Sequence, residues 1–244
     1  MTQVVRGWDA DLGDALAAGE LGEPPADLAA FEAAFVRHVQ AGACCPEAAW
    51  DAFYDSTLDR VAHGWGAAEG GGTVDTFSRI WARAARLSRG ASVLDVGSCF
   101  GFLALVWSAR PGAPHLLSAD LSHPSAALLA RQARRLGRAV TSVCADGTRL
   151  PMADRAVDTV LVLHVLEHLR PPPAGRLLAE ALRVARQRVV VAVPIEDVPD
   201  RVYGHLQAFD LPALGRLGRL TGWQATVEEA DGGWLVLDRP DPFR

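Results

Sequence analysis

The spacing of apolar side chains changes near residue 90, and the chain divides there into two kinds of sequence. Before this point, apolar positions recur at three- and four-residue steps, which is typical of amphipathic helices. The clearest series is Leu28, Phe31, Phe35 and Val39, and it follows Asp27, a residue type that caps helix N-termini. Two further helices are expected, over residues 50–61 and 73–87.

Beyond residue 90, short apolar runs alternate with helical patterns, which indicates a parallel sheet with helical crossovers. Asp231-Gly232-Gly233 predicts a hairpin between the last two strands. We therefore expect an α/β fold with a doubly wound, mostly parallel seven-stranded sheet. A glycine run ending at residue 72 separates an N-terminal helical extension or lid, residues 1–72, from the sheet domain, residues 73–244. The expected strands are 92–96, 115–119, 140–145, 158–163, 188–193, 224–229 and 234–237, and the expected helices between them are 102–110, 124–136, 174–185 and 211–220.

The composition indicates a folded domain and argues against binding of nucleic acid by charge alone. With 244 residues, 50% of them hydrophobic, the chain can bury a substantial core. Its formal net charge is -5, whereas neutralising phosphates requires a concentrated positive surface. All 24 basic residues are arginine, so lysine Schiff-base chemistry is excluded.

The cysteines and the first residues favour a cytoplasmic protein. Cys44, Cys45, Cys99 and Cys144 form no C-x-x-C pair, so we expect reduced thiols rather than a disulfide framework or a zinc site. Residues 1–7 lack the apolar core of a secretory signal. No run approaches the ~20 apolar residues that span a bilayer, so no membrane partner is expected.

A turn with two glycines follows the first expected strand, in the sequence VLDVGSCFGF at residues 93–102. Gly97 and Gly101 can supply a tight turn with close backbone approach, and the following helix offers free amide groups, so the segment can build a nucleotide-sized pocket. The G-x-G-x-x-G fingerprint of nicotinamide cofactors does not fit, because its second and third glycines fall on Cys99 and Phe102. An ordinary strand-turn-helix connection is the alternative.

Carboxylates also end the next two expected strands. Asp120 lies 19 residues after Gly101, at a strand end where a carboxylate can accept both ribose hydroxyls of a nucleoside. Asp146, followed by Gly147, closes the third strand in the same way. A turn-forming Asp in Asp120-Leu121-Ser122 is the alternative for the first of them.

The strongest sequence signal surrounds the fourth expected strand, where LPMADRAVDTVLV at residues 150–162 precedes HVLEHL at residues 164–169. With the glycine turn and the strand-end carboxylates, these segments resemble class I S-adenosylmethionine (SAM) methyltransferases, whose first motif is D-x-G-x-G-x-G. Cys99 stands at the middle glycine of that motif. The resemblance implies SAM as the cofactor, with Asp120 on the ribose and Asp146 on the adenine amino group. The cofactor-binding residues that it implies are Asp95, Gly97, Cys99, Gly101, Asp120, Leu121, Asp146, Gly147 and His164.

His164, Glu167 and His168 spell H-x-x-E-H, which raises the question of a metal. Inverted zinc proteases need this motif inside a long helix, whereas the prolines at 171–173 stop a helix here after about two turns. Small-RNA 2'-O-methyltransferases and some ubiquinone-pathway O-methyltransferases also resemble this stretch, and they hold a divalent cation through E-x-x-E-H. Here His164 replaces the first Glu, which leaves a metal-bound and a metal-free site open.

His205 lies in YGHLQAFD, residues 203–210, and similar H-x-x-x-F segments of class I O-methyltransferases lie over the substrate pocket. This resemblance implies that His205 meets Glu167 and His168 in space. A hydroxyl acceptor needs a base to take its proton, and histidine near neutral pH suits that task. We expect His205 or His168 to be the base, with Glu167 orienting the imidazolium or all three holding a metal. A helix cap or packing on the proline-rich loop is the alternative for His205.

The segment FYDSTL at residues 53–58, the glycine turn and the His205 segment together resemble actinobacterial methyltransferases associated with mycofactocin, a redox cofactor that carries a glucose chain. The resemblance implies methyl transfer to a hydroxyl of a small glycosylated substrate. Three alternatives stay open: another small-molecule hydroxyl, an RNA ribose, or a non-catalytic scaffold in which Cys99 weakens SAM binding.

Overall fold

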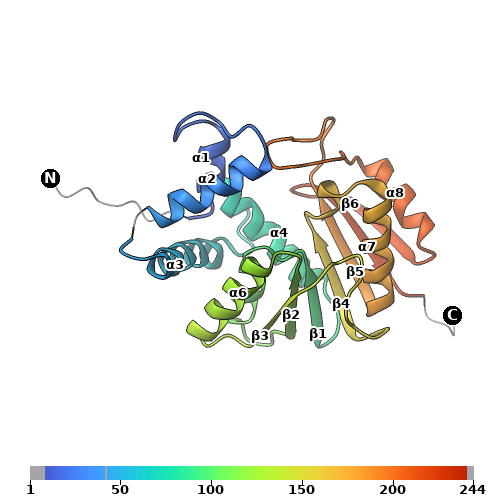
Figure 1. The fold of residues 1–244 in the computed structure, drawn as a ribbon. Coiled ribbons are helices and arrows are strands. Elements are labelled where there is room, and N and C mark those ends of the chain that lie inside the picture. Colours follow the sequence, from blue (N-terminus) through green and yellow to red (C-terminus); the bar gives the residue numbers. More distant parts are fainter. Residues whose placement is uncertain (1–8, 42, 241–244) are drawn as a thin grey trace. The chain divides into compact units, whose positions relative to one another are not determined.

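The computed structural model describes residues 9–41 and 43–240, which form two compact units (Figure 1). The first unit extends to Ala82 and includes Asp200–Gly204, and the second contains Arg83–Pro199 and the chain from His205 onward. The expected domain boundary at residues 72/73 stays a prediction. Residues 1–7, on which the expectation of no secretory signal depends, lie outside the described residues. Among the described helices, none is long and apolar enough to cross a bilayer.

The first unit is helical, as its apolar spacing predicts. The side chain of Asp27 accepts a hydrogen bond from the Ala30 amide at 2.9 Å and so caps the helix that follows, whose Phe35 and Val39 are buried. The hydrophobic pattern does not predict the first helix, because six residues are too few to show a helical period. The helices are α1 (Leu12–Ala17), α2 (Leu28–Gln40), α3 (Pro46–Gly64) and the first part of α4 (Thr73–Leu87).

Two aspartates in and beside α1 cap the start of α4. Asp14 accepts hydrogen bonds from the Thr73 hydroxyl at 2.6 Å and the Thr73 amide at 3.1 Å, and Asp11 accepts one from the Val74 amide at 2.8 Å. The hydroxyl of Tyr203 donates to the same Asp14 carboxylate at 3.3 Å. This contact explains why the distant segment 200–204 belongs to the helical unit.

The second unit is a seven-stranded sheet in the order β3-β2-β1-β4-β5-β7-β6. The first five strands pair in parallel, and β7 runs antiparallel to both of its neighbours, which confirms the predicted fold class and the hairpin at Asp231. The strands are β1 (Ser92–Val96), β2 (His115–Asp120), β3 (Val140–Cys144), β4 (Val157–Leu163), β5 (Ala185–Val193), β6 (Gln224–Glu229) and β7 (Gly233–Asp238).

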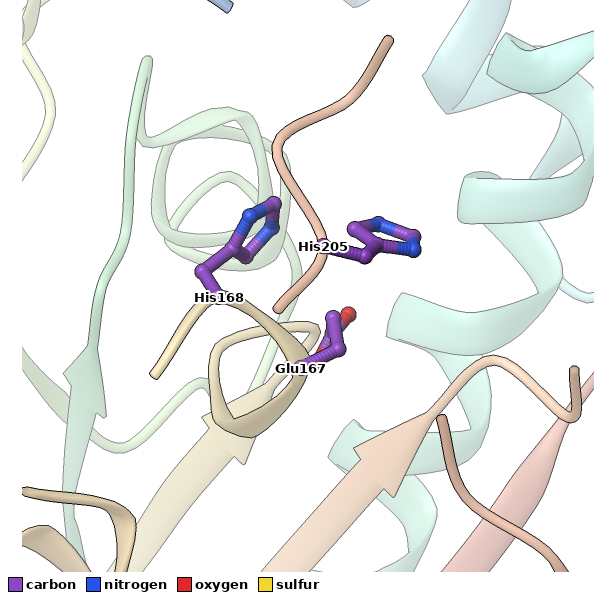
Figure 2. Close-up of side chains that lie close together, drawn as sticks. All are labelled: Glu167, His168 and His205. Carbon is purple, nitrogen blue, oxygen red and sulfur yellow. The ribbon is translucent and has the colours of Figure 1, made fainter. Parts of the chain in front are cut away.

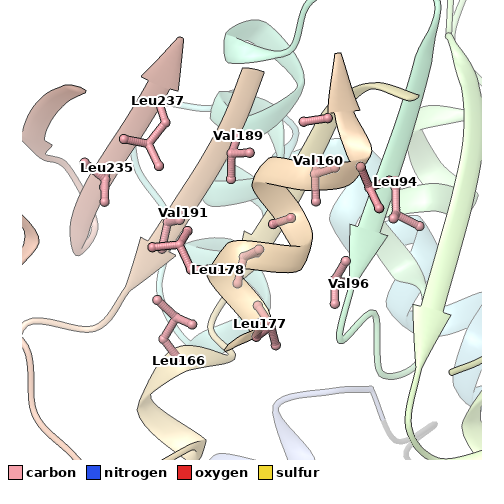
Figure 3. Close-up of a cluster of buried hydrophobic side chains, with 14 of the residues drawn as sticks. Leu94, Val96, Val160, Leu166, Leu177, Leu178, Val189, Val191, Leu235 and Leu237 are labelled. Atoms are coloured by element: carbon pink, nitrogen blue, oxygen red, sulfur yellow. The ribbon is translucent and has the colours of Figure 1, made fainter. Parts of the chain in front are cut away.

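The helices of this unit pack along the sheet and close its core. Helix α6 (His123–Arg135) contacts β2 and β3, α7 (Pro171–Val184) contacts β4 and β5, and α8 (Leu211–Leu220) contacts β6 and β7, while α5 (Phe102–Trp107) contacts β2. All seven residues of β4 are buried, as expected of a central parallel strand covered on both faces. Figure 3 shows Leu177 and Leu178 of α7 among the valines and leucines of the neighbouring strands.

Helix α7 and strand β5 both begin three residues before their predicted starts. Proline is tolerated in the first turn of a helix, where its missing N–H would have no partner, so Pro171 opens α7 instead of preceding it. Strand β5 follows α7 directly and accommodates Arg188 because the guanidinium forms two 2.8 Å hydrogen bonds with Asp238 of β7 and donates to the Leu87 carbonyl at 2.6 Å. Residues 185–187 extend the strand beyond its predicted start, because Ala185 pairs in register with Val157 of β4 and the polar Arg186 and Gln187 donate hydrogen bonds to Asp158.

Asp158 at the start of β4 joins several chain segments, and its replacement by Asn should destabilise the unit. Its carboxylate accepts hydrogen bonds from the Ala91 amide at 2.9 Å, from Ser92, and from Arg186 and Gln187 of β5. Burial alone would raise its pKa, but the hydrogen bonds from Gln187, Ala91, Arg186 and Ser92 outweigh burial and hold the pKa well below its ordinary value.

We expect Asp158→Asn to lower the free energy of unfolding by about 2–4 kcal/mol at pH 7 in urea titrations. Because the folded-state pKa is depressed, this contribution is present above the unfolded pKa of about 4 and fades as the pH falls below it. The difference between the two proteins should therefore shrink in acid. The exposed Glu229 provides a control, and an Asp158→Asn variant as stable as Glu229→Gln at pH 7 would contradict this assignment.

Candidate functional site

The candidate cofactor residues lie at the carboxyl ends of β1 to β4, which meet at one edge of the parallel sheet. Asp120, the last residue of β2, pairs in register with Cys144 at the end of β3. Its side chain also reaches the loop after β1, where it accepts a hydrogen bond from the Cys99 amide at 2.7 Å. The structure thus brings together the glycine turn and the strand-end carboxylate that the sequence places in separate segments.

The glycine turn needs its glycines for local packing and backbone shape. Gly97 and Gly101 have φ angles of 75° and 71°, and a Cβ atom would lie 2.5 Å from Val165 at the first and 2.4 Å from Leu129 at the second. Cys99 also has a positive φ, of 49°, although it is not glycine. The middle position of the turn therefore carries a backbone conformation that glycine would adopt more easily.

Asp120 retains capacity to bind a ligand beyond its local hydrogen bonds. One carboxylate oxygen accepts from the Cys99 amide, and the other accepts from the Ser122 amide at 2.8 Å. A carboxylate has about four lone-pair sites, so two further donors can be accommodated. The neighbouring Leu121 is 74% exposed, which leaves its apolar side chain available to cover a bound ring.

Asp95, by contrast, is almost completely buried at the end of β1. Asp95 is 6% exposed. Burial raises the pKa of its carboxyl group to about 7, and the negative charge of Asp120 contributes a smaller part of this increase. A carboxylate in this state gains most from a cationic partner. The ammonium group of an amino acid ligand would supply one.

Asp146 and Gly147 follow β3 and fit the adenine end of the expected site. The Asp146 carboxylate accepts a hydrogen bond from the Thr148 amide at 2.8 Å, and the hydrogen bonds from Thr148 hold its pKa below the ordinary value. A Cβ atom on Gly147 would lie 2.8 Å from Val96 of β1, so this glycine brings the loop close to the central strand. Asp146 is therefore ionised near neutral pH and can accept a hydrogen bond from an amino group.

A second group of candidate functional residues, Glu167, His168 and His205, gathers above the end of β4 (Figure 2). Glu167 and His168 belong to a short 3-10 turn, η1 (Leu166–His168), and His205 comes from the segment between β5 and α8. One potential ligand atom from each lies within 4.8 Å of the others, and the two imidazole ring centres are 5.0 Å apart. The expected meeting of His205 with Glu167 and His168 is confirmed, while their roles stay predictions.

Glu167 is the most deeply buried member of the cluster, at 1% exposure. Neither of its carboxylate oxygens accepts a hydrogen bond from the described residues, and Nδ1 of His164 lies 3.4 Å from one of them. Burying an ionised carboxylate without such compensation is costly. The site therefore fits a cation, either an imidazolium or a metal ion.

Backbone contacts hold the His205 segment against the 3-10 turn. The carbonyl of Glu167 accepts a hydrogen bond from the Leu206 amide at 2.7 Å. The side-chain amide of Gln207 donates to the carbonyls of Leu166 and Leu169 at 2.9 and 2.8 Å. The sequence does not predict this role of Gln207, because no spacing rule links it to a turn about 40 residues earlier.

His205 also has a carboxylate partner that the sequence does not predict. Its Nδ1 lies 2.9 Å from a carboxylate oxygen of Glu196, which follows β5. The only signal in the sequence is the acidic pair Glu196-Asp197 directly after an apolar strand. His164 directly follows β4 with a φ of 55° and lies beside Glu167, and its expected role at the cofactor stays a prediction. The H-x-x-E-H motif lies outside any long helix among the described residues, as the prolines predict.

Comparison with known proteins relates this fold to methyltransferases. Residues 94–193 match a family model described as a methyltransferase domain. No curated protein matches the chain. The fold is that of class I methyltransferases, with a seven-stranded Rossmann-like sheet and flanking helices.

Solved structures share this fold at low sequence identity. A SAM-dependent methyltransferase from Aquifex aeolicus is 18% identical with a TM-score of 0.53, over 67% of this chain and 88% of that one. Magnesium protoporphyrin IX methyltransferase from Synechocystis PCC 6803, solved with bound S-adenosylhomocysteine, is 16% identical with a TM-score of 0.52, over 78% and 97%. The cyclase SpnF is 21% identical with a TM-score of 0.58, over 76% and 92%, so the fold by itself does not decide the reaction.

Proposed function

We propose that this protein is a SAM-dependent O-methyltransferase that methylates a hydroxyl of a small glycosylated molecule. The observation that carries the proposal is the cluster of Glu167, His168 and His205 beside the cofactor edge of the sheet. The positions of Asp95, Asp120 and Asp146, at or just after the carboxyl ends of β1, β2 and β3, support SAM as the cofactor. A glucose hydroxyl of mycofactocin is the acceptor that the sequence resemblance favours.

The proposed mechanism assigns binding and proton transfer to different residues. SAM supplies an electrophilic methyl group on a sulfonium, and the acceptor oxygen must approach it in line. Asp120 would bind the ribose hydroxyls, and Asp95 would compensate the charge of the methionine ammonium. His205, or His168 beside it, would take the proton of the acceptor hydroxyl as the new bond forms, and Glu167 would stabilise the resulting imidazolium.

Incubation with SAM carrying a labelled methyl group tests the proposal. We expect label to enter glycosylated small molecules from an actinobacterial extract rather than its nucleic-acid fraction, because the formal charge of -5 does not favour RNA. Label in RNA would contradict the proposed acceptor class. Weak binding of SAM with no transfer to any fraction would favour a scaffold. Recovery of affinity in Cys99→Gly would then identify the strained turn as the cause of the weak binding.

A metal at the same cluster is a second candidate, because Glu167 is buried without a hydrogen bond from the described residues. Two imidazoles and a carboxylate form a donor set that suits zinc and other first-row divalent cations. Such a cation would lower the pKa of an acceptor hydroxyl. Chelator treatment separates the candidates: unchanged transfer supports a histidine base alone, whereas loss that added cation restores supports the metal.

A further inference from the structure

The segment from Glu196 to Phe209 leaves the sheet after β5 and returns to the same place. Ile195 and Phe209 form an isolated parallel bridge, and the Glu196 amide donates to the Phe209 carbonyl at 3.2 Å. Phe209 is 8% exposed, so this return point is anchored in the core. Glu196 is therefore held at a fixed position at the base of the loop that carries His205.

The contact between Glu196 and His205 determines which imidazole nitrogen carries the proton. The carboxylate can only accept from Nδ1, at 2.9 Å, so Nδ1 carries a hydrogen and the lone pair of the neutral ring lies on Nε2. The two side chains are 21% and 10% exposed, so solvent competes weakly with this bond. Glu196 thus fixes the imidazole ring of His205. The 3-10 turn fixes the backbone beside it through Leu206 and Gln207.

We propose that Glu196 is the positioning residue of His205: it holds the ring in the Nδ1–H tautomer, with Nε2 as the nitrogen that meets the acceptor proton or a cation. The proposal rests on the proposed function of the cluster. Carboxylates that orient an imidazole in this way typically contribute a factor of 10–100 to activity or affinity when they act on a metal ligand. Glu167 and His168, the other ionisable groups at the cluster, lie on the turn beneath the loop.

The direct test is nitrogen NMR of the ¹⁵N-histidine-labelled protein without substrate, with the His205 signals assigned from the His205→Gln spectrum. We expect a protonated Nδ1 and an unprotonated Nε2 in the wild type and in Glu196→Gln, whose amide oxygen can still accept the bond. In Glu196→Ala this preference should be lost. An Nε2–H tautomer in the wild type, or the same tautomer in Glu196→Ala, would overturn the proposal.

Kinetics provide the second readout. Glu196→Ala should lower kcat about 10- to 100-fold, with KM for the acceptor and the affinity for SAM changed less than about twofold, and Glu196→Gln should recover part of kcat. Asp197→Ala is the matched control, because Asp197 is an exposed neighbour and the described contact to His205 comes from Glu196. Equal kcat in Glu196→Ala and Asp197→Ala would overturn the proposal. Absence of SAM binding in the wild type would instead refute the proposed function, and the tautomer measurement would still stand.

Discussion

Replacing His205 with alanine is expected to lower methyl transfer about 100- to 10,000-fold while SAM still binds. A positioned general base contributes a factor of this size. The expected cofactor residues Asp95 and Asp120 lie on strands β1 and β2, so their contacts should survive the substitution. Single-turnover transfer and calorimetric titration with SAM separate the two effects.

His115→Ala is the control for this prediction, because this exposed histidine lies at the opposite, amino end of β2. It should retain wild-type transfer. Thermal unfolding should show that His205→Ala is folded, since loss of the Glu196 and ring contacts removes only part of the loop's anchoring. Normal transfer by a folded His205→Ala would remove this residue from the mechanism and leave His168 as the candidate base.

The second large effect concerns Asp95, whose burial couples cofactor binding to pH. Asp95 has a pKa of about 7 in the ligand-free protein, so below pH 7 it is mostly protonated. It must then lose its proton before its negative charge can balance the positive charge of a ligand ammonium group. SAM affinity should therefore weaken as the pH falls below 7, by up to tenfold per pH unit. Asp95→Asn should bind SAM at least about tenfold more weakly at pH 8 and should lose this pH dependence.

The same substitution should stabilise the ligand-free protein. Because the folded-state pKa of Asp95 lies above its unfolded value of about 4, the native state holds an extra proton between these values, and stability falls as the pH rises through this window. Above pH 7 the buried charge is fully destabilising. Asp95→Asn should therefore raise the free energy of unfolding by about 2–4 kcal/mol at pH 8 and by much less at pH 4. A variant less stable than wild type at pH 8 would contradict this account.

The sheet could be predicted from the sequence because its strands are covered on both faces. Strand β4 is buried throughout, so it forms a continuous apolar run that differs clearly from the amphipathic helices beside it. The prediction was wrong at the start of β5, where Arg186 and Gln187 donate hydrogen bonds to Asp158 and supply stabilisation that no apolar pattern records. It also ended α5 at residue 110, whereas the helix ends at Trp107.

The candidate site could be predicted only as far as parallel topology dictates it. Asp95, Asp120 and Asp146 end or follow consecutive parallel strands, so their proximity at one edge follows from the order of the elements. Glu196 and Gln207 could not be found in this way. They contact His205 and the 3-10 turn through a loop without periodic sequence, and only the three-dimensional path of that loop brings them there.

The same fold also occurs in a protein named as a cyclase, so the fold alone does not establish methyl transfer. The proposed activity requires that the protein binds the methyl donor. Calorimetric titration with SAM and S-adenosylhomocysteine is therefore the most direct test. We predict that both bind with one-to-one stoichiometry and that Asp120→Ala, which removes the expected ribose acceptor, weakens both. If neither molecule binds to the folded wild-type protein, the account of this chain as a methyltransferase is contradicted.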